Sequence, residues 1–167
     1  MPTNSARGEG GREAKTRPVP RRRAREFALQ GLYQHQLSGN TRAAIRAQLA
    51  EAGGFAKADA AYFDELFAGV TGSYDSLVDL IAPHLDRRPA ELSPIERAIL
   101  VIGAWELKEQ PEIPYRVVIN EAIELAKSYG GTDGHRFVNG VLDKLAARVR
   151  APEIAATARE RDAARRG

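Results

Sequence analysis

Hydrophobic residues recur along this chain with the spacing of α-helices. In the first clear stretch, residues 21–38, small and apolar positions fall three or four residues apart, which is typical of a helix with one buried face. These positions are Ala24, Phe27, Ala28, Gly31, Leu32 and His35. No segment of four to eight residues alternates cleanly between apolar and polar, as a half-buried strand does. The pattern therefore predicts a chain made of helices.

The same periodicity marks further helices. The pattern between residues 59 and 81 predicts one long helix, or two helices that meet at Gly72 and Ser73. The segment 94–109 is apolar around most of its circumference, so we expect it to lie at the centre of the protein. In all, the expected helices cover about residues 21–38, 41–53, 59–81, 94–109, 115–129 and 133–149.

Polar residues support two of these helix starts. Ser93 and Glu96 have the spacing of a capping box, in which Ser93 accepts from the N–H of Glu96 and the Glu96 carboxylate reaches back to Ser93. Thr132 or Asp133 is expected to cap the last core helix through its side chain.

The helices fall into two groups connected by short loops. We expect about six or seven helices, arranged as helical subdomains of about residues 20–86 and 90–150 within one all-α domain, 20–150. Residues 1–19 carry almost no apolar side chain and are expected to form a disordered basic extension. Residues 151–167 are expected to form a charged C-terminal tail outside the core.

Charge is concentrated at the N-terminus. Residues 1–25 hold eight Lys or Arg residues and two Glu residues, a net charge of +6, whereas the rest of the chain carries a net charge of −3. A basic arm on a mildly acidic body indicates a polyanionic partner such as nucleic acid. The alternative is a tail that only improves solubility.

Composition excludes several kinds of chemistry. Cys is absent, which rules out disulfides, thiolate metal sites and Cys nucleophiles. No apolar run is long enough to span a membrane, and the charged N-terminus is not followed by the apolar segment of a signal peptide, so we expect a cytoplasmic protein without membrane contact. The three His residues lie on three different expected elements, and no phosphate-binding, metalloprotease or hydrolase motif occurs. We therefore expect no catalytic residue, no metal site, no cofactor and no enzymatic activity.

Several blocks of sequence together resemble the bacterial NusB transcription-antitermination family. They are RRRAREFALQGLY at residues 21–33, IERAIL at 95–100, VINEAIELAK at 118–127 and HRFVNGVLDK at 135–144. The resemblance covers about residues 20–150, and the last two blocks are its most specific part. It implies two packed antiparallel helical bundles that share a core.

The resemblance also implies a function. Proteins of this family bind the boxA element of nascent transcripts, chiefly those of ribosomal RNA operons. They do so as a heterodimer with NusE, a small-subunit ribosomal protein, and join other Nus factors on RNA polymerase to suppress termination. No cofactor and no catalysis are implied.

Three arginines of the first helix are candidate RNA-binding residues. At 100° per residue, Arg21, Arg22 and Arg25 fall within about one third of the helix circumference, away from the apolar stripe. Their planar guanidinium groups suit phosphate oxygens. The alternative is that they are surface residues that only keep the protein soluble.

A second candidate group lies at the start of the last core helix. From its spacing Phe137 is a core residue, and the resemblance instead implies a Phe that stacks on an RNA base. Arg136 lies beside it. If RNA passes here, the Asp133 carboxylate opposes the phosphates by like-charge repulsion.

The resemblance places Tyr33 and Glu96 on the side that faces NusE. Without it, Tyr33 is a residue at the edge of the core and Glu96 is the capping-box acid. The surface expected for NusE could also support a homodimer.

Two other functions remain open. The chain could be a relative of the NusB-like RNA-binding module that is fused to rRNA cytosine-5 methyltransferases, although no catalytic domain and no Cys nucleophile are present. It could also be a protein-interaction adaptor without RNA contact, a hypothesis that the arginine run disfavours.

Overall fold

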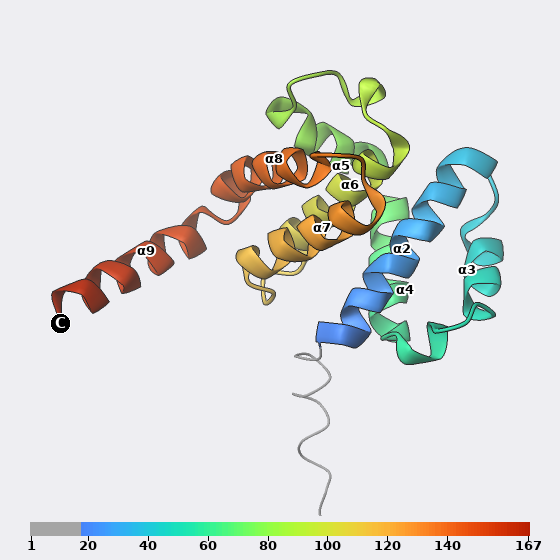
Figure 1. Ribbon diagram of the computed structural model, residues 1–167, viewed down its shortest axis with the longest axis horizontal. Helices are drawn as coiled ribbons and strands as arrows, with labels where there is room; N and C mark the ends of the chain where they lie inside the picture. Colours follow the sequence, from blue (N-terminus) through green and yellow to red (C-terminus); the bar gives the residue numbers. More distant parts are fainter. Residues whose placement is uncertain (1–17) are drawn as a thin grey trace, which may run out of the picture.

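A computed structural model of the protein describes residues 18–167, and this range is built of helices and connecting turns without strands (Figure 1). Its α-helices are α2 (Pro18–Ser38), α3 (Arg42–Ala50), α4 (Ala60–Gly72), α5 (Tyr74–Ile81), α6 (Pro94–Glu109), α7 (Tyr115–Tyr129), α8 (Gly134–Val149) and α9 (Ala151–Arg166). Short 3₁₀ turns are η1 (Phe55–Lys57), η2 (Ala82–His84) and η3 (Pro89–Glu91). The predicted all-helical class is confirmed. The basic extension predicted for residues 1–19 lies outside the described residues, apart from the first two residues of α2.

The helix count exceeds the prediction for two local reasons. The pattern between residues 59 and 81 forms two helices, α4 and α5, which meet at Ser73 with an irregular backbone (φ −124°, ψ 20°). The C-terminal tail also forms a helix, α9. Side-chain caps fix other starts, since Thr41 accepts from the N–H of Ala44 and Asp59 accepts from the N–H of Tyr62.

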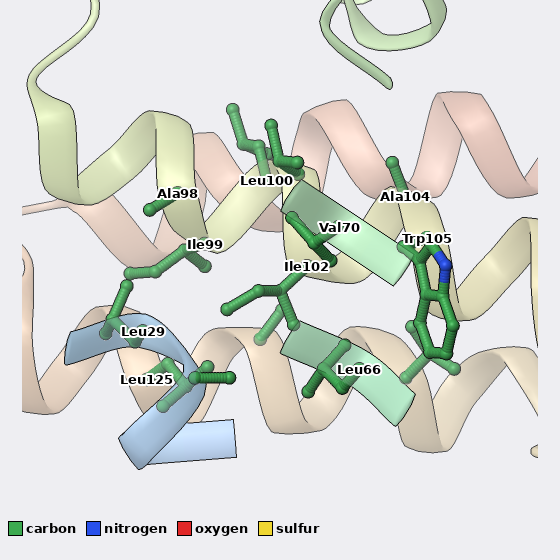
Figure 2. Packing of buried hydrophobic residues seen from close by; sticks show 14 of the residues in the cluster. Leu29, Leu66, Val70, Ala98, Ile99, Leu100, Ile102, Ala104, Trp105 and Leu125 are labelled. Carbon is green, nitrogen blue, oxygen red and sulfur yellow. The ribbon is translucent and has the colours of Figure 1, made fainter. Parts of the chain in front are cut away.

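The central position predicted for residues 94–109 is confirmed. Every residue of α6 from Ala98 to Leu107 is buried, and α6 contacts α2, α4, α5, α7 and α8. Figure 2 shows side chains of α2, α4 and α7 packed around this helix. Two glycines permit the close approach, because a Cβ on Gly69 would overlap the Trp105 indole and a Cβ on Gly103 would lie 2.7 Å from Leu142.

The C-terminal helix α9 has no buried residue and is attached to the body of the protein only at its first turn. Arg150 is buried and donates to carbonyl oxygens in the last turn of α6 and the loop after it, those of Glu106, Leu107, Gln110 and Ile113. Glu153 accepts from the N–H of Tyr115 and so caps α7, while Ile154 packs against the core. Beyond this turn α9 extends away from the body (Figure 1). None of the described helices is long and apolar enough to cross a membrane.

Candidate nucleic-acid interface

Arg25 of α2 is buried, with 3% of its surface exposed, and it forms an ion pair with Glu106 of α6. Its Nε and Nη2 atoms donate to the Glu106 carboxylate over 2.8–3.1 Å. Burial alone would lower the pKa of Arg25, but the adjacent Glu106 carboxylate raises it above its ordinary value. The expectation that Arg25 faces solvent is therefore wrong. More of the circumference of α2 is buried than its apolar residues indicate.

Two further residues complete this interior cluster. Tyr62 of α4 also donates its hydroxyl to Glu106, and burial together with that carboxylate raises the pKa of Tyr62. The Arg21 guanidinium lies over the Tyr62 ring, 4.2 Å from its centroid, and 3.9 Å from the carboxylate of Asp59. The Arg21 side chain is only 16% exposed. Arg21 and Arg25 thus hold the start of α2 against α4 and α6.

Arg22 lies at the rim of the same region. Its Nε and Nη2 atoms each donate to the Glu121 carboxylate of α7 at 3.0 Å, and 45% of the side chain is exposed. Glu121 is itself buried and also lies 3.9 Å from Arg25. Of the three candidate arginines, Arg22 is the one that presents much of its side chain to solvent.

The turn before α8 places Asp133 differently from the prediction. Asp133 adopts a left-handed conformation (φ 64°), and its side chain makes no capping hydrogen bond. Its backbone carbonyl accepts instead from the N–H groups of Arg136 and Phe137, at 3.1 and 3.4 Å. The expectation of a side-chain cap at this helix start is thus wrong for Asp133. The carboxylate points into solvent, 69% exposed, beside the Arg136 side chain, which is 80% exposed.

Phe137 lies at the edge of the core. It is half-buried and packs against the hydrophobic cluster. The guanidinium of Arg87, in the segment between η2 and η3, lies over its ring at 4.8 Å from the centroid. Sequence reasoning missed Arg87, because the residue belongs to a linker without periodicity and meets Phe137 only through the fold. This end of α8 therefore presents an aromatic ring flanked by two cations.

Tyr33 lies on α2 and Glu96 lies in the first turn of α6. Tyr33 is 38% exposed on α2 and lines a groove against α3, and Leu37, one turn further along, is 60% exposed. The last turn of α2 meets α5, since Gln36 donates to the Tyr74 hydroxyl at 2.8 Å. The positive charge of Arg97, next to Glu96 on α6, also acts on the Tyr74 hydroxyl.

The capping box predicted at the start of α6 is half formed. Ser93 accepts from the N–H of Glu96 at 3.1 Å. Among the described hydrogen bonds, the reciprocal bond to the Glu96 carboxylate is absent. That carboxylate lies instead beside Gly134, where a Cβ would be 3.3 Å from Glu96 Oε1. Glu96 therefore adjoins the start of α8.

Helix α7 is linked to α2 at two places along its length. Glu121 holds Arg22, and Tyr129, at the end of the helix, lies near Glu26 of α2, whose charge adds to burial in raising the pKa of Tyr129. At 1.5 Å per residue, about 12 Å of helix separates Glu121 from Tyr129. Within residues 18–167 no group of three His, Asp or Glu side chains could hold a metal ion.

The fold and these surfaces define a class, the small all-helical transcription antitermination proteins. The NusB family model matches residues 22–147, and the chain belongs to the NusB family. It is 58% identical to the transcription antitermination protein NusB of Azoarcus sp. over 146 residues, which covers 87% of this chain and 94% of that protein. It is also 58% identical to NusB of Nitrosomonas europaea over 134 residues, 80% of each protein.

Solved structures agree with the fold. T. maritima NusB superposes with a TM-score of 0.69 at 30% identity, covering 77% of this chain and 92% of that one. A chain from a crystal structure of the antitermination factors NusB and NusE in complex with dsRNA superposes with a TM-score of 0.67 at 24% identity, over 77% of this chain and 97% of that one. The second likeness concerns the fold alone.

Proposed function

We propose that this protein binds the boxA element of nascent ribosomal RNA transcripts as a heterodimer with NusE. In this proposal it joins RNA polymerase and other Nus factors in the cytoplasm, suppresses termination, and acts by binding without catalysis or cofactor. Family membership supports the antitermination role. The observation that carries the RNA site is the exposed Arg136 beside the partly exposed ring of Phe137 at the start of α8.

The chemistry of this helix start suits a single strand. An aromatic ring at the protein surface stacks on a base with about 1–3 kcal/mol per base, whatever the base. Arg136 supplies an exposed cation beside it. The exposed Asp133 carboxylate opposes phosphate at the same place and moderates affinity.

The arginines of α2 take unequal roles in this proposal. Arg22 is the one of the three that can reach phosphate, because nearly half of its side chain is exposed, but to do so it must leave the Glu121 carboxylate. Arg21 and Arg25 act as positioning residues, since their guanidinium groups are occupied by Tyr62 and Glu106 and hold the start of α2.

NusE occupies the surface that carries Tyr33 and Leu37, with Glu96 at its border. The exposed apolar side chains on α2 provide contact area, and Glu96 suits a basic side chain of the partner. Because Glu96 adjoins the start of α8, a basic partner docked there adds phosphate contacts and tightens RNA binding by linkage. A homodimer through the same surface would compete with NusE.

One observation favours a second candidate, a protein-interaction adaptor without RNA contact. The guanidinium groups of Arg21, Arg22 and Arg25 all lie beside carboxylates of this chain, so the arginine run is weaker evidence for RNA than its sequence indicates.

Binding of a boxA RNA, with and without NusE, separates the two candidates. Phe137→Leu keeps an apolar side chain at the core edge and removes the aromatic ring, and Arg136→Gln removes one exposed charge. We expect Phe137→Leu to weaken RNA binding roughly 5- to 150-fold, the equivalent of one lost stacking contact. Lys108→Gln, an exposed cation on α6, serves as the control. Absence of boxA binding by the folded wild-type protein, with and without NusE, would favour the adaptor. Unchanged RNA affinity in both folded α8 variants would place the RNA site elsewhere on the protein.

A further inference from the structure

Within residues 18–167, two cations on α8 form no ion pair, unlike the arginines of α2, although the charge of Lys144 acts on Asp86, the exposed partner of Arg87. Lys144 and Arg148 are exposed, and from residue 18 onward neither forms an ion pair or a side-chain hydrogen bond. They follow Phe137 by seven and eleven residues, which places all three on one face of the helix. Over this length α8 rises by about 16 Å.

The groove beside these cations holds a histidine that is neutral at pH 7 and one acid. His84 of η2 lies near both cations. Burial, and then the charges of Arg148 and Lys144, lower the pKa of His84. Arg148 and His84 line a groove between α5, η2 and α8, whose other walls include Leu80 and Leu145. One acid, Asp79, also lines the groove.

The path from Phe137 to these cations is open. Gly140 lies between Phe137 and Lys144 on the same face of α8, is exposed, and a Cβ built on it meets no atom within 4 Å. At the Phe137 end, Arg87 lies over the ring with 43% of its side chain exposed and pairs with Asp86 at 2.8 Å. An aromatic ring, a flat stretch and unpaired cations therefore follow one another along a single helix.

We propose that RNA held at Phe137 continues along α8, where Lys144 and Arg148 bind the phosphates of nucleotides flanking boxA. This inference rests on the proposed function and adds a second, sequence-independent part to the same site. Single-stranded RNA suits this surface because stacking rings and cations in series bind a strand without reading its bases. The cations need not give up a carboxylate to bind phosphate, whereas Arg22 would have to leave Glu121.

A length series of RNAs tests the proposal in the presence of NusE. The probes are a boxA oligonucleotide and the same RNA extended at its 5′ or 3′ end by uridines. We expect one extension to tighten binding to the wild-type protein and to steepen the dependence of log K on log salt by about 1.4, since each single-strand phosphate contact contributes about 0.7. Between 50 and 200 mM salt, that difference corresponds to about a sevenfold larger loss of affinity.

The double variant Lys144→Gln/Arg148→Gln should lose this gain and bind the short RNA as the wild type does. Gln is nearly as good a helix former as Lys and Arg, so the melting temperature should be unchanged. The matched control is Lys108→Gln/Lys127→Gln, which removes two exposed cations elsewhere and should keep the gain.

The outcomes separate this proposal from the proposed function. If none of the proteins binds the short RNA, the proposed function itself is wrong. If the short RNA binds but neither extension tightens binding, or the gain persists in the α8 double variant, the proposed track along α8 is wrong. Binding of polyglutamate to the wild type but not to the double variant, without any gain from extended RNA, would assign the surface to an acidic protein instead.

Discussion

The pair Arg25–Glu106 should contribute far more to stability than an exposed pair of the same geometry. Arg25→Ala leaves the Glu106 carboxylate, 1% exposed, with Tyr62 as its remaining side-chain donor. Removing one partner of a buried ion pair costs about 3–5 kcal/mol, because the other charge stays desolvated and uncompensated. For a protein of this size that corresponds to a fall of roughly 6–20 °C in melting temperature.

The assay is urea unfolding at pH 7 followed by Trp105 fluorescence, since the chain contains one Trp. The control is Arg46→Ala, which removes an exposed pair with Asp64 held by two hydrogen bonds of 3.0 and 3.2 Å. Pairs exposed to solvent contribute about 0–1 kcal/mol, so this variant should be nearly as stable as the wild type.

A double variant completes the test. Arg25→Leu/Glu106→Leu removes both charges and should be more stable than Arg25→Ala, because no uncompensated charge remains in the interior. An Arg25→Ala protein that loses less than about 1 kcal/mol would place Arg25 at the surface, as its sequence position indicated, and would refute the reasoning.

Three further outcomes follow from other contacts. Gly69→Ala should cost about 1–3 kcal/mol of unfolding free energy, because the added methyl group must displace the Trp105 indole; unchanged urea unfolding would contradict the close approach. Asp133→Asn should keep the melting temperature, since Asn tolerates the left-handed conformation, and should tighten RNA binding most at low salt; equal affinity at every salt concentration would place RNA elsewhere. The folded state raises the pKa of Tyr62 above its ordinary value of 10.0, so the unfolded chain loses this proton first as pH rises. The free energy of unfolding should therefore fall above pH 10. Urea unfolding between pH 10 and 11 should show a shallower fall for Tyr62→Phe than for the wild type.

Periodicity was enough to predict the helices because each one buries a continuous apolar face. The clearest case is α6, whose residues are apolar all round and which lies at the centre of the protein. The break between α4 and α5 was marked by Gly72 and Ser73, where the sequence lacks strong helix formers.

The burial of Arg25 could not be predicted from the pattern of α2 alone. Its partner Glu106 is 81 residues away, and residues 21–33 carry no trace of that pairing. A signal did exist in α6, where Glu106 interrupts an otherwise apolar run from Ala98 to Leu107. An acid on a helix that is buried all round requires a cation, so the question to ask was which cation reaches it.

The turn at Asp133 shows a second limit of local rules. Asp favours helix caps in the extended conformation, but between Thr132 and Gly134 it occupies the left-handed region that Asn, Asp and Gly tolerate best. The Arg87–Phe137 contact lies beyond any local rule, because the two residues are 50 positions apart in the sequence and meet only in the folded protein.

These contacts change how basic residues should be counted in a protein of this kind. An arginine with a carboxylate beside it contributes little to RNA affinity, because binding phosphate would leave the carboxylate without its cationic partner. For Arg25 that carboxylate is buried. Within residues 18–167, Lys144 and Arg148 form no ion pair that phosphate binding would break. The salt dependence of RNA binding should therefore follow Lys144 and Arg148 on α8 more closely than the longer run of arginines on α2.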